Sequence, residues 1–206
     1  MATTRDAEQA GAARRARIVE AALGLFAAHG YRGTSLAAVA EAAGITRSGL
    51  LHHFPSKEAL LAEALAERDR QAFDAVEVDR EYEGPAILRA LDIADELVER
   101  NQRNRELARL GHLAIFEAND IPEFARDWAR ERTRTFRDNL ARVVEESVAV
   151  GEVRADTDAT SVASIIIAVI SGLGEQWQHD QSFDMVGAMR TLTDVLRRDL
   201  LIERHG

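Results

Sequence analysis

Apolar side chains recur at intervals of three and four residues along almost the whole chain, which is the spacing of one face of an α-helix. The pattern is strongest at Val162, Ile165, Ile166, Val169, Ile170 and Leu173. No segment shows the strict alternation of apolar and polar residues that is typical of a half-buried strand. Only three prolines are present, and alanine and leucine favour helix. The sequence predicts an all-α fold.

Glycine, proline and capping residues divide this pattern into nine helices. Gly44 suits a helix end because glycine readily adopts the left-handed conformation, and Pro55 cannot continue a helix. The helices are expected at about residues 14–29, 35–43, 46–54, 56–78, 85–100, 105–117, 122–150, 160–177 and 184–201. We expect a disordered tail over residues 1–13, an N-terminal three-helix bundle over residues 14–58 and a larger six-helix C-terminal domain over residues 59–206.

The second and third helices have the pattern of a helix-turn-helix. They are short, they are joined at Gly44, and the second of them begins at the capping residue Thr46. In such a pair the second helix enters the major groove of DNA and its first residues meet the base edges. Those residues must be small or carry donors, as Arg47, Ser48 and Gly49 do. The pattern therefore indicates DNA binding, with the second helix as the recognition helix.

Residues 14–60 resemble the TetR family of transcriptional regulators. The resemblance is carried by the runs Gly30–Leu36, Val39–Ala40, Ala43–Leu50 and His52–Glu58. The rest of the chain resembles the family in general form only, at Gly151–Arg154 and Gly172–Trp177 among other places. The resemblance implies a DNA-binding head on a C-terminal domain that binds a small molecule and dimerises.

The resemblance also implies which residues meet DNA. Arg47 stands at the position that often reads bases, where an arginine can pair with guanine, and Ser48 stands where direct or water-mediated base contacts are common. Leu51 occupies a position at which an aromatic residue is frequent, so only an apolar contact with a thymine methyl group is expected there. Phosphate contacts are expected from Thr34, Ser35, Thr46, His52, His53 and Lys57. Leu50 and Phe54 are expected in the core.

The last two helices carry more apolar side chains than one helix pair needs. The resemblance implies that they pack against the same two helices of a second copy, and symmetric dimers are the usual oligomer. The expected interface consists of Ile165, Val169, Ile170, Leu173, Met189, Leu192, Leu196 and Leu200.

A pocket for a small molecule is implied by the resemblance alone. Pockets are mainly apolar with a few polar groups that fix the ligand. The candidates are Phe73, Leu110, His112, Phe116, Trp128, Ile166, Gln176 and Trp177. Each of them taken singly is more simply explained as part of the core.

The charge of the chain is divided unevenly. The formal net charge is −9, which is unusual for a DNA-binding protein as a whole. Residues 1–60, however, carry seven basic and five acidic side chains, whereas residues 61–206 carry nineteen basic and thirty acidic ones. The basic excess thus coincides with the predicted DNA-binding head.

Several classes of protein are disfavoured. The absence of cysteine excludes disulfides, thiolate metal sites and cysteine nucleophiles. The adjacent His52 and His53 point in different directions on a helix and lack a third ligand, and Asp156 and Asp158 suit helix capping, so no metal and no cofactor are expected. No glycine-rich phosphate loop or catalytic triad spacing occurs, so we do not expect an enzyme.

The longest apolar run is shorter than the roughly 20 residues that span a bilayer as a helix, and the N-terminus has no signal-peptide pattern. We therefore expect a cytoplasmic protein without a membrane partner. The sequence predicts a ligand-responsive regulator, in the first place a repressor that binds palindromic double-stranded operator DNA as a homodimer and is released by a small-molecule effector. The alternative is a dimeric binding or interaction module that no longer reads DNA.

Overall fold

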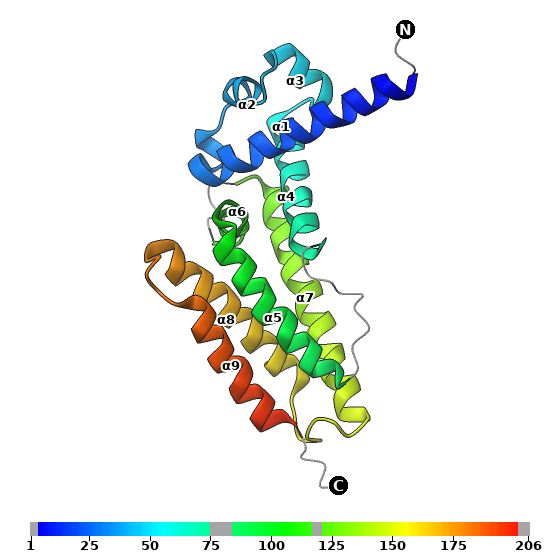
Figure 1. Ribbon diagram of the computed structural model, residues 1–206, viewed down its shortest axis with the longest axis vertical. Coiled ribbons are helices and arrows are strands. Elements are labelled where there is room, and N and C mark those ends of the chain that lie inside the picture. Colours follow the sequence, from blue (N-terminus) through cyan, green and yellow to red (C-terminus); the bar gives the residue numbers. More distant parts are fainter. Residues whose placement is uncertain (1–3, 75–83, 117–120, 202–206) are drawn as a thin grey trace. The chain divides into compact units, whose positions relative to one another are not determined.

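The computed structural model describes residues 4–74, 84–116 and 121–201, and this part of the chain is helical with no strand (Figure 1). The all-α prediction and the number of helices are confirmed for these residues. The nine helices are α1 (Thr4–Gly33), α2 (Leu36–Ala42), α3 (Arg47–His53), α4 (Lys57–Asp74), α5 (Ala86–Arg103), α6 (Arg105–Phe116), α7 (Glu123–Ala149), α8 (Ala159–His179) and α9 (Met185–Leu200). The predicted end of the fourth helix near residue 78 lies outside the described residues.

The helix α1 begins well before the predicted position. It runs from Thr4, whereas the sequence analysis expects a disordered tail to residue 13. The physical reason is composition: this segment is rich in alanine and has no proline, and Asp6 in the first turn favours the positive end of the helix dipole. At the other end, Gly30 has a positive φ of 68° and kinks the helix, at the place where the sequence predicts its end.

The chain forms two compact units whose boundary differs from the predicted one. The first unit contains residues 1–71 and 109–127, and the second contains residues 72–108 and 128–206. Most of α4 and parts of α6 and α7 therefore belong with the head. Residues far apart in the sequence come together here: the buried Arg68 guanidinium of α4 packs against Gly111 of α6, where a Cβ atom would collide with it.

The core of the first unit lies under α1. Its buried side chains include the predicted stripe Ile18, Val19, Ala22, Leu23 and Phe26, together with Val39 and Ala40 of α2, Leu50 of α3 and Leu60, Leu61 and Leu65 of α4. Burial of this apolar face positions the two short helices α2 and α3 on α1 and α4. The predicted inward face of the first helix is confirmed.

In the second unit, α5, α8 and α9 pack against one another. One apolar cluster joins Leu91 and Val98 of α5, Ile166 and Trp177 of α8 and Met189 of α9. A second cluster joins Ile87 of α5 to Ala141 and Val144 of α7. The second cluster also contains Ala163 of α8 and Leu200 of α9, so α5, α7, α8 and α9 share one apolar core.

Aspartates cap both C-terminal helices. Asp158 accepts a hydrogen bond from the Ser161 amide at 3.1 Å, and Asp184 accepts one from the Gly187 amide at 2.9 Å. Asp156 pairs instead with Arg154. The prediction that this acidic pair serves the entry of the helix is confirmed for Asp158.

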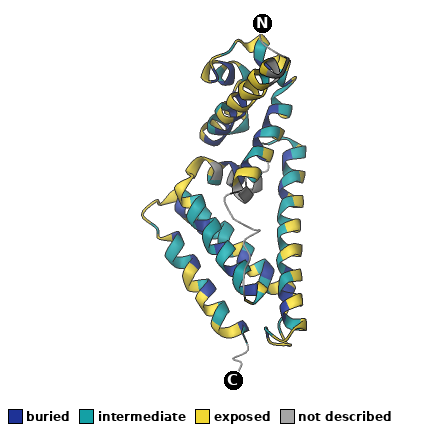
Figure 2. Cartoon of the chain, turned by 45° about the vertical axis from the view of Figure 1, so that its right-hand side comes forward, coloured by how far each residue is buried: buried dark blue, intermediate teal, exposed yellow. Residues whose placement is uncertain are grey.

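The helix α8 is the most apolar one. By length and composition it is the one helix in the described part of the chain that could cross a membrane, although core helices of soluble proteins pass the same test. Only 22% of its most apolar window is buried within the chain. Ile165 in α8 is 51% exposed and Val195 in α9 is 45% exposed, and Figure 2 shows exposed residues along α9. An apolar face of this pair therefore has no partner among the described residues of the chain.

Candidate nucleic-acid interface

The two helices α2 and α3 form a helix-turn-helix whose turn is built from local bonds. Ser35 caps α2 by accepting a hydrogen bond from the Ala38 amide at 3.1 Å. The chain then reverses at Gly44, whose φ of 67° favours glycine, and the Ile45 amide donates to the Ala40 carbonyl at 2.9 Å. Thr46 caps α3 by accepting from the Gly49 amide at 3.1 Å. These bonds fix the start of α3.

One face of α3 is buried and the other is presented outward. Leu50 is fully buried and Phe54, just after the helix, is 3% exposed, so the core prediction for both is confirmed. Arg47, Ser48 and His52 are exposed, and Leu51 is 36% exposed. The helix therefore presents a polar tip with an arginine in its first turn. Ser35 and Thr46 are exposed beside it, and His53 and Lys57 are half-buried.

Thr34 differs from the prediction. This side chain is 2% exposed, and its hydroxyl lies 3.0 Å from the Leu25 carbonyl and 2.9 Å from the Gly30 carbonyl, to which it donates. A buried hydroxyl must find such partners because leaving it unpaired costs free energy. In the structure Thr34 ties the end of α1 to the start of α2 and does not lie on the exposed face.

Lys57 lies in a small cluster at the start of α4. Its Nζ atom lies 4.3 Å from the centroid of the Tyr31 ring, and the Tyr31 hydroxyl donates to Glu58 Oε1 at 2.5 Å. Burial, and then the hydrogen bond to Glu58, raise the pKa of Tyr31 to about 12. Burial lowers the pKa of Lys57, against the opposing charge of Glu58. The lysine is thus held over a tyrosine that is not ionised at neutral pH.

Two residues of this region are missing from the sequence-based site. Tyr31 belongs to the Gly30–Leu36 run and supports Lys57. Arg15 in α1 donates two hydrogen bonds to Glu63 of α4, at 2.7 and 3.0 Å, and its guanidinium lies 4.9 Å from the Phe54 ring centroid. Arg15 therefore ties α1, α4 and the end of α3 together. No local signal indicates that pair, since its partners are 48 residues apart.

The comparison with protein families follows the same division of the chain. The model for "Bacterial regulatory proteins, tetR family" matches residues 18–64, and the model for "Tetracyclin repressor-like, C-terminal domain" matches residues 112–191. Together they cover more than half of the chain. The chain belongs to the TetR family. Its helix-turn-helix is therefore the DNA-binding element of a transcriptional regulator.

Similar TetR-family proteins match either the head or most of the chain. RutR of Escherichia coli is 45% identical over 58 residues, which are 28% of this chain and only 27% of RutR. TtgR of Pseudomonas putida is 27% identical over 186 residues, 87% of this chain and 88% of TtgR. A TetR transcriptional regulator from Chloroflexus aurantiacus shares the fold with a TM-score of 0.81 and 22% identity, over 94% of this chain and 99% of that one.

The residues expected at the dimer interface of this TetR-family chain fall into two groups. Ile165 is exposed, and Val169, Ile170, Leu192 and Leu196 are half-buried. Leu173, Met189 and Leu200 differ from the expectation, because they are buried within the chain itself at 7%, 0% and 5% exposure. They lie on the faces of α8 and α9 that pack against α5 and α7. Val195, which the sequence analysis did not select, is exposed instead.

The predicted pocket residues that the structure describes are divided between the two units. Ile166 and Trp177 pack in the core of the second unit, whereas Leu110 is buried in the first unit. Trp128 is half-buried in α7, and Gln176 is exposed. The side chains of Phe73, His112 and Phe116 lie outside the described residues.

Proposed function

We propose that the protein binds palindromic operator DNA as a homodimer, acts as a transcriptional repressor in the cytoplasm and is released by a small-molecule effector. The observation that carries the proposal is the polar tip of α3, which Leu50 anchors and Thr46 caps. A rigid, outward-facing helix start with a donor-bearing first turn is what major-groove reading requires.

Each exposed residue has a proposed role. Arg47 pairs with a guanine, Ser48 contacts a base directly or through water, and Leu51 meets a thymine methyl group. Ser35, Thr46, His52, His53 and Lys57 contact phosphates, which position the head and make binding dependent on salt. Thr34 supports the head from inside by its two bonds to backbone carbonyls.

The exposed apolar face of α8 and α9 supports the dimer. Ile165, Gly172 and Val195 outline it: the two branched side chains are exposed, and nothing in the described part of the chain lies within 4 Å of a Cβ built on Gly172. A second copy that covers this face would bury it and leave Gly172 as a point of close approach. A twofold pair also matches half-sites about 34–36 Å apart or a multiple of that distance.

Release by an effector follows from linkage. An effector that favours a body conformation with the wrong spacing of the two recognition helices weakens DNA binding, and DNA weakens the effector by the same factor. The match to a tetracycline-repressor-like C-terminal domain supports a ligand site in the body.

The test is binding to the DNA upstream of the protein's own gene, measured by fluorescence polarisation at several salt concentrations. Arg47→Ala should weaken specific binding by about 1–3 kcal/mol and relax one operator position, whereas Lys57→Ala should weaken binding to all sequences and reduce the salt slope by about one. Arg142→Ala is the matched control, because this arginine is exposed in α7 and paired with Glu146. Wild-type binding no tighter than to a scrambled duplex contradicts the proposal.

A further inference from the structure

The second unit contains an arginine whose guanidinium is only partly paired among the described residues. One terminal nitrogen of Arg100, Nη1, is buried and has no hydrogen-bond partner within the described part of the chain. The residue as a whole is half-buried near the carboxyl end of α5. A buried donor that stays unpaired is costly, and more so when it is charged. Arginines are almost never buried unless they are paired.

A second guanidinium faces the same region from α7. Burial, and then the positive charge of Arg132, lower the pKa of Arg100. The packing agrees with this neighbourhood, because Ile87 of α5 belongs to one apolar cluster with Ala141 and Val144 of α7, and α5 and α7 run in opposite directions (Figure 1). Arg100, thirteen residues after Ile87 in α5, therefore lies level with the start of α7. Two positive charges close together in a partly buried region repel each other, because little water screens them there, and this repulsion destabilises the ligand-free protein.

Two aromatic side chains of α7 lie against the Arg132 guanidinium. The Arg132 guanidinium lies 4.6 Å from the Phe136 ring centroid and 5.8 Å from that of Trp128. Arg100 thus places an unused donor near a guanidinium that lies against two apolar rings.

We propose that the effector of this protein is a mainly apolar molecule with an acidic group, and that Arg100 binds that group between α5 and α7. This inference rests on the proposed function and specifies its ligand class. A carboxylate or sulfonate matches the guanidinium fork in two parallel hydrogen bonds. The anion also offsets the repulsion between Arg100 and Arg132, while Trp128 and Phe136 contact the apolar body.

The experiment compares two probes with the same ring system. 1-Anilinonaphthalene-8-sulfonate carries an acidic group, and N-phenyl-1-naphthylamine does not. Fluorescence titration of the full-length wild type should give an affinity for the sulfonate at least about tenfold higher than for the neutral amine, as expected for one charged hydrogen-bonded pair. Arg100→Gln should remove this preference by weakening the sulfonate alone, and Arg100→Lys should restore part of it.

The matched control is Arg103→Gln, one turn away on α5. Arg103 is 73% exposed and already paired with Glu99, so the preference for the sulfonate should persist. An equal affinity for both probes in the wild type, no binding of either probe, or an unchanged preference in Arg100→Gln overturns the proposal.

A stability measurement separates ligand binding from a structural role. Removal of an unpaired buried charge should raise the thermal midpoint of Arg100→Met by at least about 2 °C without ligand, whereas loss of a structural contact would lower it. Measurement of operator binding by the same variants tests the proposed regulator separately from the proposed anionic effector. A wild type that binds operator but lacks the sulfonate preference refutes the anionic effector alone, and a wild type that binds the sulfonate through Arg100 but no operator refutes the regulator alone.

Discussion

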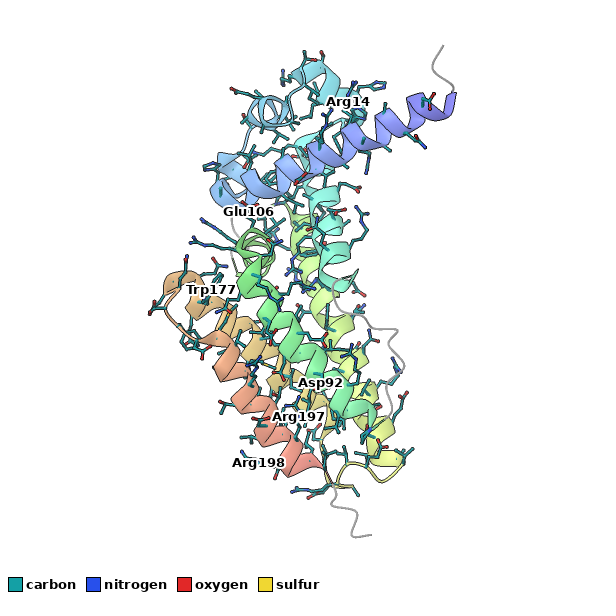
Figure 3. All side chains as sticks on the ribbon, in the orientation of Figure 1. Arg14, Asp92, Glu106, Trp177, Arg197 and Arg198 are labelled. Carbon is teal, nitrogen blue, oxygen red and sulfur yellow. The ribbon has the colours of Figure 1, made fainter. Side chains whose placement is uncertain are left out.

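The recognition helix α3 and the last helix α9 both bury apolar side chains, but they differ in the polar contacts of the inner face and in the apolar side chains exposed on the outer face. In α3 the apolar Leu50 is buried and the exposed tip is polar. In α9 a buried threonine, Thr193, donates to both carboxylate oxygens of Asp95 in α5, at 3.0 and 3.1 Å, and Arg197 contacts Asp92 at 2.8 Å. Figure 3 shows Asp92 and Arg197 where α5 and α9 meet. The outer side of α9 exposes Val195.

The difference separates two kinds of surface. The exposed tip of α3 carries polar side chains, which are stable in water and can form hydrogen bonds with phosphates and base edges. The outer face of α8 and α9 places branched apolar side chains in water, which is unfavourable for an isolated chain, while charged groups on the inner side hold α9 on α5. The first surface is suited to DNA and the second to another copy of the protein.

The adjacent residues Leu50 and Leu51 test the inner and outer faces of α3. Leu50→Ala should lower the free energy of unfolding by about 2–5 kcal/mol, because it leaves a cavity in the head. Leu51→Ala should change it by no more than about 0.5 kcal/mol. Urea unfolding followed by circular dichroism measures both. Similar losses for the two variants would mean that α3 is not anchored as described.

The outer face of α8 and α9 can be made incompatible with a partner. Ile165→Asp combined with Val195→Asp should dissociate the dimer and weaken operator binding at least about 100-fold, since the two heads then bind separately. Sedimentation velocity and fluorescence polarisation check the two effects. Val150→Asp is the control, because Val150 is 64% exposed but lies in the turn after α7. A dimer that survives the double substitution assigns the interface elsewhere.

The inner side of α9 is tested by two neighbouring arginines. Arg197→Met should lower the free energy of unfolding by about 1–3 kcal/mol, because Asp92 and Asp95 lose a donor where both helices pack. Arg198→Met should have an effect below about 0.5 kcal/mol, since Arg198 is exposed. Chemical denaturation distinguishes the two variants. Equal effects would show that the contacts of α9 with α5 do not stabilise the fold.

The smallest expected effect concerns the free energy of unfolding at low pH. The hydrogen bond from Arg15 holds the pKa of Glu63 below its ordinary value. A lowered pKa stabilises the folded state above the unfolded pKa, and this contribution disappears as the pH falls through the folded pKa. Glu63→Gln should therefore cost less than about 1 kcal/mol at pH 7, and the gap to the wild type should close on acidification below about pH 4. Urea unfolding at several pH values measures the gap, and a gap that widens in acid contradicts the role of this pair.

Much of the head could be predicted because its determinants are local. The caps Ser35 and Thr46 and the turn at Gly44 each involve residues within about one helical turn, so spacing in the sequence reveals them, and the apolar period of the helix indicates that Leu50 faces inward. The alanine-rich start of α1 is local too, and helix propensity gives its reason. Thr34 shows the limit even there: its position in the sequence suits a surface contact, but its hydroxyl bonds to a carbonyl nine residues earlier.

The sequence alone determined that the chain is all-α, where most of its helices begin and end, and that it carries a helix-turn-helix with Arg47 at its tip. Only the tertiary structure decided which apolar residues of α8 and α9 face inward, that most of α4 and part of α6 belong with the head, and that one nitrogen of Arg100 is buried without a hydrogen-bond partner among the described residues. The reason is distance along the chain: Asp95 and Thr193 are 98 residues apart, and helical periodicity defines a face without specifying what covers it.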